Sequence, residues 1–179
     1  MKIEPDKHLS GTSVNRMNWE SVLALNTCPD CYTCHGTIFP PSANTADCKA
    51  YHHFCRCSMP SMRTKTAGTA TEKGVLGADA FLSWLKRLPD YYVTKSEAKK
   101  HGWKNFKGNP EDVLPEKMIG GDVYKNKSEK LPVRTERIWR EADIDYVSGY
   151  RNTKRILYSD DGLVFVSNDH YQTFYEILP

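Results

Sequence analysis

The sequence predicts an α+β domain that follows a small module rich in cysteine and histidine. Apolar residues recur at helical spacing in the first part of the C-terminal hundred residues, and they alternate at strand spacing from residue 137 onwards. Helices followed by antiparallel strands are the α+β order. All six cysteines lie between Cys28 and Cys57. We therefore expect N-terminal helices packed on an antiparallel β-sheet, preceded by a separate cysteine module.

Three helices are predicted ahead of the sheet. The first begins near residue 77, ends at Pro89 and has four apolar residues on one face: Phe81, Leu82, Leu85 and Leu88. The second begins with a capping box, in which Thr94 is followed three residues later by Glu97, and ends near Gly102. The third is short and opens at Asn109, which precedes a proline and two acidic residues.

The rest of the domain reads as strands. Residues 137–146 alternate around Trp139 and Glu141. Residues 155–158 and 163–166 flank an Asp-Asp-Gly turn and predict a hairpin. A last strand is expected over the alternating residues 170–177, which include His170.

Composition and charge limit the function classes. The chain has 179 residues and a net charge of only +3, so any phosphate site must be a local cluster of cations. It has no long apolar run and no apolar N-terminal stretch typical of a signal peptide. We expect a protein that is cytoplasmic as produced, or delivered by a non-classical or phage-type route. Residues 61–75 are small and polar and are interpreted as a linker between modules at 1–60 and 76–179.

The cysteines are spaced like zinc ligands. Two close pairs separated by a loop can close into a tetrahedral structural site, for which we favour four ligands: Cys28, Cys31, His52 and Cys55. Cys34, Cys48 and Cys57 are possible substitutes. A disulfide cluster is the alternative, and a reducing cytosol favours zinc over it.

A second group of residues has the chemistry of phosphodiester cleavage without a metal. Glu141 and His170, each expected in a strand, could exchange protons with the nucleophile and the leaving oxygen. Three cations could hold the phosphate: Lys95, Arg151 and Arg155. Lys95 lies in the first turn of its helix, where an anion also binds favourably. Taken singly, each of these residues also fits an ordinary solvated surface role.

The cysteine segment resembles the C-terminal end of phage minor head proteins of the Mu F type. The resemblance rests on Cys28 and Cys31, on Gly36 and Phe39, and on the ending over residues 52–57. It covers only about thirty residues, and Cys34 and Cys48 are additional. It implies an origin in phage or prophage, where nuclease domains are sometimes carried as toxins.

From residue 88 to residue 177 the chain resembles the barnase-like bacterial ribonucleases. The matching runs are 88–98, 120–122, 130–132, 139–144, 148–152, 155–159 and 169–174. The resemblance implies Glu141 as general base and His170 as general acid, with a phosphate clamp of Lys95, Arg151 and Arg155. It implies that Tyr171 contacts a base or phosphate and that Asp122 is a buried residue that organises the cleft. Such chemistry needs the ribose 2′-hydroxyl and excludes DNA.

The resemblance also implies a base-recognition loop with these residues: Tyr124, Lys125, Asn126, Lys127 and Glu129. The family pattern has arginine and glutamate where this chain has Lys127 and Ser128, and an acid appears one place later at Glu129. Because the family glutamate accepts hydrogen bonds from guanine, we expect a weaker guanine preference.

These observations favour an endoribonuclease that acts through a 2′,3′-cyclic phosphate. We expect no cofactor in catalysis, a structural zinc in the first module, RNA as substrate, and neither DNA nor membrane as partner. A bacterial or phage-borne toxin would need a barstar-like acidic immunity protein, captured through opposite charge. The alternative is a phage structural or packaging component that binds RNA or protein without catalysis. A zinc-finger DNA regulator is disfavoured, because no basic recognition helix accompanies the cysteines.

Overall fold

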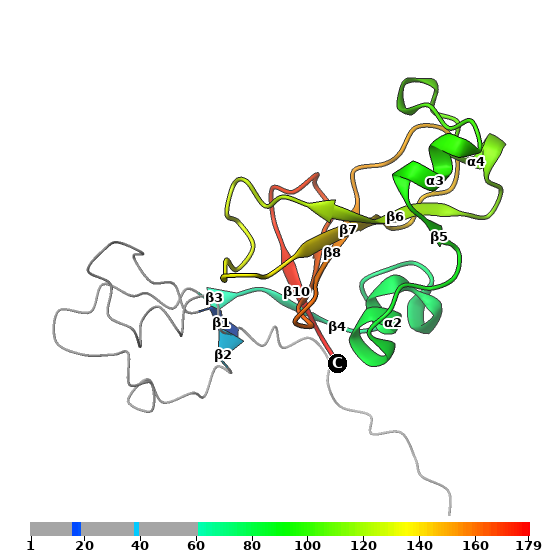
Figure 1. Ribbon diagram of the computed structural model, residues 1–179. Coiled ribbons are helices and arrows are strands. Elements are labelled where there is room, and N and C mark those ends of the chain that lie inside the picture. The colour runs from blue at the N-terminus through cyan, green and yellow to red at the C-terminus, as the bar shows by residue number, and fades with distance from the viewer. Residues whose placement is uncertain (1–15, 19–37, 40–60) are drawn as a thin grey trace, which may run out of the picture.

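The computed structural model describes residues 16–18, 38–39 and 61–179 (Figure 1). Among these residues, no helix has the length and apolar character needed to cross a membrane. The helices are η2 (Gly74–Leu76), α2 (Ala78–Leu85), α3 (Lys95–Lys100), η3 (Asn105–Lys107) and α4 (Pro110–Val113). The strands are β1 (Arg16–Asn18), β2 (Ile38–Phe39), β3 (Ser61–Met62), β4 (Thr64–Thr66), β5 (Tyr92–Val93), β6 (Met118–Tyr124), β7 (Trp139–Asp143), β8 (Arg155–Ser159), β9 (Val164–Ser167) and β10 (Tyr175–Leu178).

The main sheet has seven strands in the order β4-β10-β9-β8-β7-β6-β5, and β2-β1-β3 form a small separate sheet. The five strands from β6 to β10 pair antiparallel. Strands were predicted in the regions of β7, β8, β9 and β10, whereas none was predicted over β6. The two edge strands differ, because β4 is parallel to β10 and β5 is parallel to β6. The sheet is therefore mixed, and the prediction of a purely antiparallel sheet holds only for its centre.

The three predicted helices are present, with shifted ends. Thr94 caps α3 by accepting a hydrogen bond from the Glu97 backbone N–H at 3.2 Å, and the helix ends at Lys100. The first helix, α2, ends when Lys86 adopts a left-handed backbone. The apolar face predicted for it is only partly buried, since Leu82 is 3% exposed whereas Leu85 is 55% exposed.

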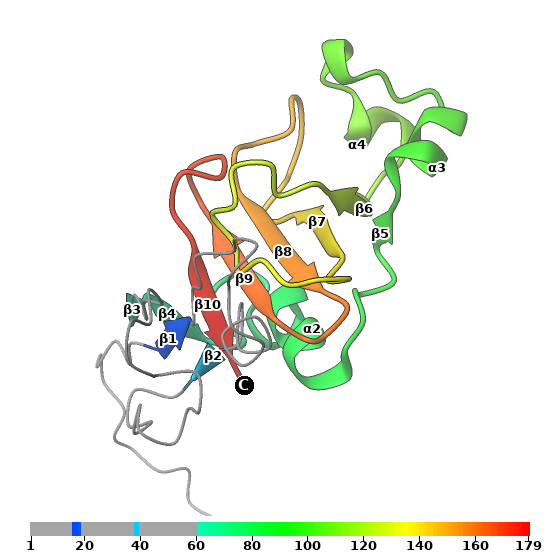
Figure 2. The ribbon, with the colours of Figure 1, turned by 60° about the vertical axis from the view of Figure 1, so that its left-hand side comes forward.

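The two faces of the sheet are covered differently (Figure 2). On one face α2 packs against β8, β9 and β10, and this core includes Leu82, Ile156 and Val166. The other face has a smaller core around Trp139 and Phe165, with four members in all: Leu131, Trp139, Leu157 and Phe165. Side chains of Tyr124 and Tyr171 pack against that smaller core. At the far end of the sheet α3 lies against β6.

The predicted linker is wrong from residue 64 onwards. Strand β4 extends the main sheet, and Ala67 and Ala70 are buried in the core under α2. The buried carboxylate of Asp79 then accepts hydrogen bonds from the backbone N–H groups of Gly68 and Ala70, at 2.8 and 2.9 Å. Small residues suit this close packing, and their small size and polarity are also why the segment looked like a linker.

Candidate active site

Glu141 projects from the middle of β7 on the face opposite α2. Its Oε1 atom lies 2.5 Å from Nζ of Lys95, at the start of α3. Its Oε2 atom accepts a hydrogen bond of 2.6 Å from the hydroxyl of Tyr171. The side chain is 10% exposed, so the two donors hold the carboxylate in one place at the floor of the site.

This environment fixes the ionisation of Glu141. Burial favours the neutral acid, but the hydrogen bonds from Lys95 and Tyr171 and the charges of Lys95 and Arg151 outweigh it, so the pKa lies below its ordinary value. Burial and the hydrogen bond to Glu141 raise the pKa of Tyr171 well above its ordinary value. The pair is therefore a carboxylate and a neutral phenol that donates to it.

Two arginines lie on the same face and share one buried carboxylate. Asp143 receives two hydrogen bonds from Arg151, from Nε at 2.7 Å and from Nη2 at 2.6 Å. Nε of Arg155 lies 3.1 Å from the same aspartate. Asp143 is 1% exposed, so the two guanidinium groups, and not water, compensate its negative charge.

Asp143 was not among the predicted site residues. A signal was available, because Asp143 lies two residues after Glu141 in the same strand and so projects from the same face. In the sheet register Asp143 also stands opposite Arg155 of β8. An acid at such a position beside a predicted cation clamp is a candidate to orient that clamp.

Asp122 lies opposite Glu141 across the β6–β7 pair. Its Oδ2 atom accepts a hydrogen bond of 2.9 Å from the backbone N–H of Lys95, the first residue of α3. Asp122 was expected to be buried, whereas it is half-buried. Its contact fixes the start of α3 against the sheet, and with it the residue that reaches Glu141.

His170 is not in a strand, contrary to the prediction. Residues 168–174 form a loop that β10 follows, in which His170 and Tyr171 have left-handed φ values of 55° and 68°. Asp169 winds the loop, because its carboxylate accepts hydrogen bonds from the Thr173 hydroxyl at 2.6 Å and from the Gln172 and Thr173 backbone N–H groups. Led by the hydroxyl of Thr173, these bonds lower the pKa of Asp169 to about 2.

The loop places His170 at the rim of the site. Its side chain is exposed, and its backbone N–H donates to the carbonyl of Thr153 at 3.1 Å. The His170 and Tyr171 ring centroids are 4.9 Å apart. His170 is therefore connected to Glu141 through Tyr171, which contacts both.

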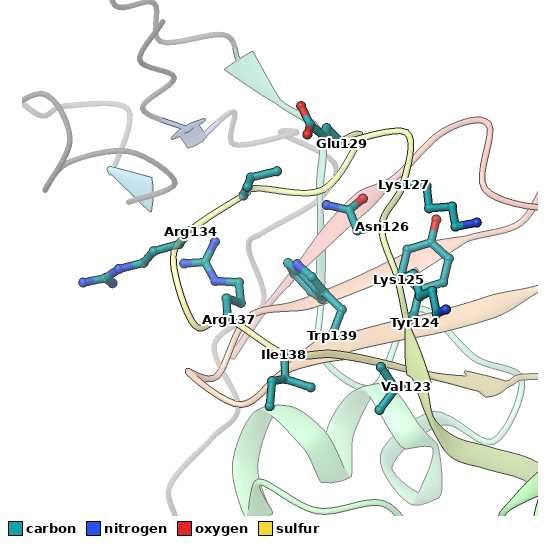
Figure 3. Close-up of a pocket in the computed structure, with 11 residues that line it drawn as sticks. Val123, Tyr124, Lys125, Asn126, Lys127, Glu129, Arg134, Arg137, Ile138 and Trp139 are labelled. Atoms are coloured by element: carbon teal, nitrogen blue, oxygen red, sulfur yellow. The ribbon is translucent and has the colours of Figure 1, made fainter. Parts of the chain in front are cut away.

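The end of β6 and the loop that follows it hold the five residues expected to recognise the base. Tyr124 stacks on Tyr171 with centroids 5.1 Å apart. The buried side chain of Asn126 donates a hydrogen bond to the Leu131 carbonyl and accepts one from the Leu131 N–H. It therefore shapes the loop, and its amide is already engaged within the protein. The loop encloses a pocket of about 520 Å³ (Figure 3). Its lining includes these side chains: Tyr124, Lys125, Asn126, Lys127, Glu129, Arg134 and Trp139.

The structure thus brings four of the five predicted catalytic residues to one sheet face: Lys95, Glu141, Arg151 and Arg155. Tyr171, which was predicted to contact a base or phosphate, lies beside Glu141 there. Lys125, Lys127 and Glu129 instead surround the adjoining pocket. The proposed zinc ligands, which are Cys28, Cys31, His52 and Cys55, lie outside the described residues. Within the described part of the chain, no group of three or more histidine, cysteine, aspartate or glutamate side chains is arranged to hold a metal ion.

Such a face can bind an anion and move protons beside it. Glu141 offers an ionised acceptor, His170 an exposed imidazole at the rim, and the three cations a field for negative charge. Arg151 and Arg155 are oriented by Asp143, so little side-chain freedom remains to be lost when an anion binds.

Comparisons with known proteins give the family. A ribonuclease family model matches residues 80–178, more than half of the chain. A ribonuclease of Heyndrickxia coagulans is 52% identical over 101 residues, which cover 56% of this chain and 93% of that protein. Ribonucleases of Bacillus intermedius and Bacillus pumilus are also 52% identical over 101 residues, and there the match covers 62% of each relative.

A solved structure, ribonuclease Sa2 with guanosine-2′-cyclophosphate, matches with 33% identity and a TM-score of 0.31, over 34% of this chain and 64% of that one. The family match begins at residue 80, so it does not include the cysteine module. By the extent of that match and the identity of its relatives, the chain belongs to the family of barnase-like bacterial ribonucleases.

Proposed function

We propose that this protein is an endoribonuclease that cleaves single-stranded RNA by attack of the 2′-hydroxyl on the adjacent phosphate. The observation that carries the proposal is the position of the Glu141 carboxylate, which accepts hydrogen bonds from both Lys95 and Tyr171. It lies on the face that also presents Arg151 and Arg155. A group with this ionisation and setting can accept a proton at neutral pH without leaving its position.

In this proposal Glu141 is the general base and takes the proton of the 2′-hydroxyl. The oxygen then forms a bond to phosphorus, the bond to the 5′-oxygen breaks, and a 2′,3′-cyclic phosphate remains. His170 is the general acid that protonates the departing 5′-oxygen. Its exposure at the rim suits a group that must meet the leaving nucleoside and then exchange its proton with water.

The cations stabilise the charge that develops on the phosphate. Arg151 and Arg155 share the single buried charge of Asp143, so the cluster keeps an excess positive charge on the sheet face. Lys95 is paired with Glu141 in the free protein. When Glu141 becomes protonated, the charge of Lys95 is released and can act on the phosphate at the moment when its negative charge rises.

We also propose that the loop of residues 124–129 reads the base, with weaker preference for guanine than the family pattern gives. Tyr124, stacked on Tyr171, supplies an aromatic surface. Ser128 lacks the carboxylate of the family glutamate. Glu129, one place further on, has a left-handed backbone with φ of 51° and lines the pocket of the loop.

The biological setting is a further part of the proposal. A toxin with a structural zinc module at its N-terminus, neutralised by a barstar-like acidic protein, agrees with the cation cluster on the sheet face and with the cysteine spacing. An adjacent small acidic reading frame in the source genome would support the toxin, whereas flanking capsid genes would support a phage packaging role.

The test is cleavage by the purified full chain. Single-stranded RNA should be cut in the presence of a chelator, with a 2′,3′-cyclic phosphate as the first product in ³¹P NMR, and DNA of the same sequence should stay intact. Glu141→Gln is the matched control, because it keeps the shape and removes the base. DNA cleavage, or RNA cleavage that the variant retains in full, would overturn the proposal.

A further inference from the structure

Two large aromatic side chains stand out from the surface close to the clamp arginines. Phe106 and Tyr150 are each 69% exposed. Two lysines, Lys104 and Lys107, flank Phe106 in sequence and are also exposed. We call these four residues the aromatic ledge. Exposed aromatics among cations are unusual for a surface that meets only water, and they indicate a partner.

The ledge is held in one shape. The hydroxyl of Tyr150 donates a hydrogen bond of 3.0 Å to the carbonyl of Phe106, which ties two segments 44 residues apart. Gly108 has φ of +57°, and a Cβ there would lie 2.9 Å from the Tyr150 ring, so only glycine allows this approach. Asn109 also accepts a hydrogen bond from the backbone N–H of Lys104 at 3.0 Å. The Tyr150 ring and the backbone that carries Phe106 are therefore positioned before any partner arrives.

The ledge is continuous with the catalytic face. Tyr150 directly precedes Arg151, whose guanidinium carbon lies 5.9 Å from the centroid of Trp103. Trp103 in turn directly precedes Lys104. A polymer bound at the arginines would therefore meet the ledge at its next residues.

The chemistry of the ledge fits single-stranded RNA. Flat aromatic rings stack on bases of any identity, and lysines that form no ion pair within the described residues can face phosphates. A folded acidic protein would use the same positive charge, but it would not need two freely exposed rings beside a phosphate site. Trp84, another large aromatic of the described residues, is 50% exposed and lies on α2, which packs on the opposite sheet face.

We propose that the aromatic ledge is a subsite for the RNA strand that flanks the cleaved phosphate, in which Phe106 and Tyr150 stack on unpaired bases and Lys104 and Lys107 contact the backbone. The proposal rests on the ribonuclease function above and names an additional part of its substrate. It makes the enzyme prefer longer single strands over dinucleotides.

The experiment compares kcat/KM for a dinucleotide and for a hexanucleotide with one cleavable position, flanked by 2′-deoxy residues. For Phe106→Ala and for Tyr150→Ala, the ratio of hexanucleotide to dinucleotide kcat/KM should fall about tenfold. Trp84→Ala is the matched control and should leave the ratio unchanged. Lys104→Gln with Lys107→Gln should flatten the salt dependence of hexanucleotide cleavage, because fewer counterions are released.

A binding measurement separates this idea from the proposed reaction. Fluorescence anisotropy with an all-deoxy hexanucleotide needs no cleavage, and Phe106→Ala should weaken its binding about tenfold. Unchanged binding and an unchanged kcat/KM ratio in both aromatic variants would overturn the proposal that the aromatic ledge binds RNA. Such a result would point to a protein partner at this surface. Absence of RNA cleavage in the unaltered protein, with binding still lost in Phe106→Ala, would overturn the reaction and keep the ledge.

Discussion

The carboxylate of Asp143 binds the guanidinium of Arg151 through two hydrogen bonds, 2.7 and 2.6 Å long, at a site where the aspartate is 1% exposed. The position of Arg151, which we propose binds the phosphate, therefore depends on a buried acid outside the proposed phosphate clamp.

Asp143→Asn should therefore damage both folding and catalysis. Removing one partner of a buried ion pair leaves the other charges uncompensated, which costs about 3–5 kcal/mol of unfolding free energy. Urea unfolding measures this loss, and dinucleotide cleavage measures the misplacement of Arg151 and Arg155. Asp112→Asn, an exposed acid on α4, is the control and should change neither. Equal stability of Asp143→Asn and the unaltered protein would contradict the proposed role.

Glu141→Gln and His170→Ala should each lower RNA cleavage by about two to four orders of magnitude, the usual contribution of a general base or acid. Folding should persist in both variants, which circular dichroism can check. His170 lies in an exposed loop, so His170→Ala is the cleaner of the two tests. Rates close to those of the unaltered protein in either variant would remove that residue from the mechanism.

The acid limb of the pH–rate profile should report Glu141. Its pKa is held below the ordinary value of 4.5, although burial alone would raise it. Activity should therefore persist to pH values below the ordinary pKa of a glutamate side chain. Tyr171→Phe removes one hydrogen bond that lowers this pKa, so the acid limb should move to higher pH. Tyr124→Phe removes a nearby hydroxyl that does not contact Glu141 and should leave the limb in place.

The lowered pKa of Glu141 also determines how the stability of the protein depends on pH. A carboxylate whose pKa is lower in the folded state stabilises that state fully above its unfolded pKa, and the contribution is lost as the pH falls through the folded pKa. The contribution of Glu141 to the free energy of unfolding should therefore be full and constant between pH 6 and pH 8, and it should decline below about pH 4.5. Chemical unfolding of the Tyr171→Phe variant across this acid range should show a smaller loss.

The first module should carry one zinc ion per chain, held by Cys28, Cys31, His52 and Cys55 and serving structure only. A chelator should release the metal without stopping cleavage, because none of these residues belongs to the proposed catalytic group. Elemental analysis and thiol-reactivity assays measure the release. Six cysteines paired in disulfides would exclude the site.

The base preference should respond to two residues of the recognition loop. Lys127→Arg with Ser128→Glu restores the family pattern and should sharpen discrimination for guanine by about 1–3 kcal/mol, if the regained charged hydrogen bonds carry their usual weight. The measurement is cleavage of four dinucleotides that differ only in the 5′ base. A strong guanine preference in the unaltered protein would show that Glu129 or the backbone already suffices.

Local sequence patterns predicted α3 and β7, whereas the strand β6 that pairs with β7 was not predicted. Thr94 and Glu97 marked the start of α3, and the alternation around Trp139 marked β7. His170 was misplaced because the polar contacts of Asp169 override an alternating pattern that looks like a strand. β4 was missed because its pairing with β10 joins residues more than 100 positions apart, which no local pattern records.

The pairing of β4 with β10 has a consequence for self-association. The Glu176 N–H donates to the carbonyl of Arg63 at 2.8 Å, and the Ala67 N–H donates to the carbonyl of Leu178 at 2.7 Å. A shortened chain that started at residue 80, where the family match begins, would leave β10 as an open edge with these groups unpaired. Unpaired edges recruit strands from other molecules. In the full chain β4 covers this edge of the sheet and pairs the backbone groups of β10 that would otherwise lie open.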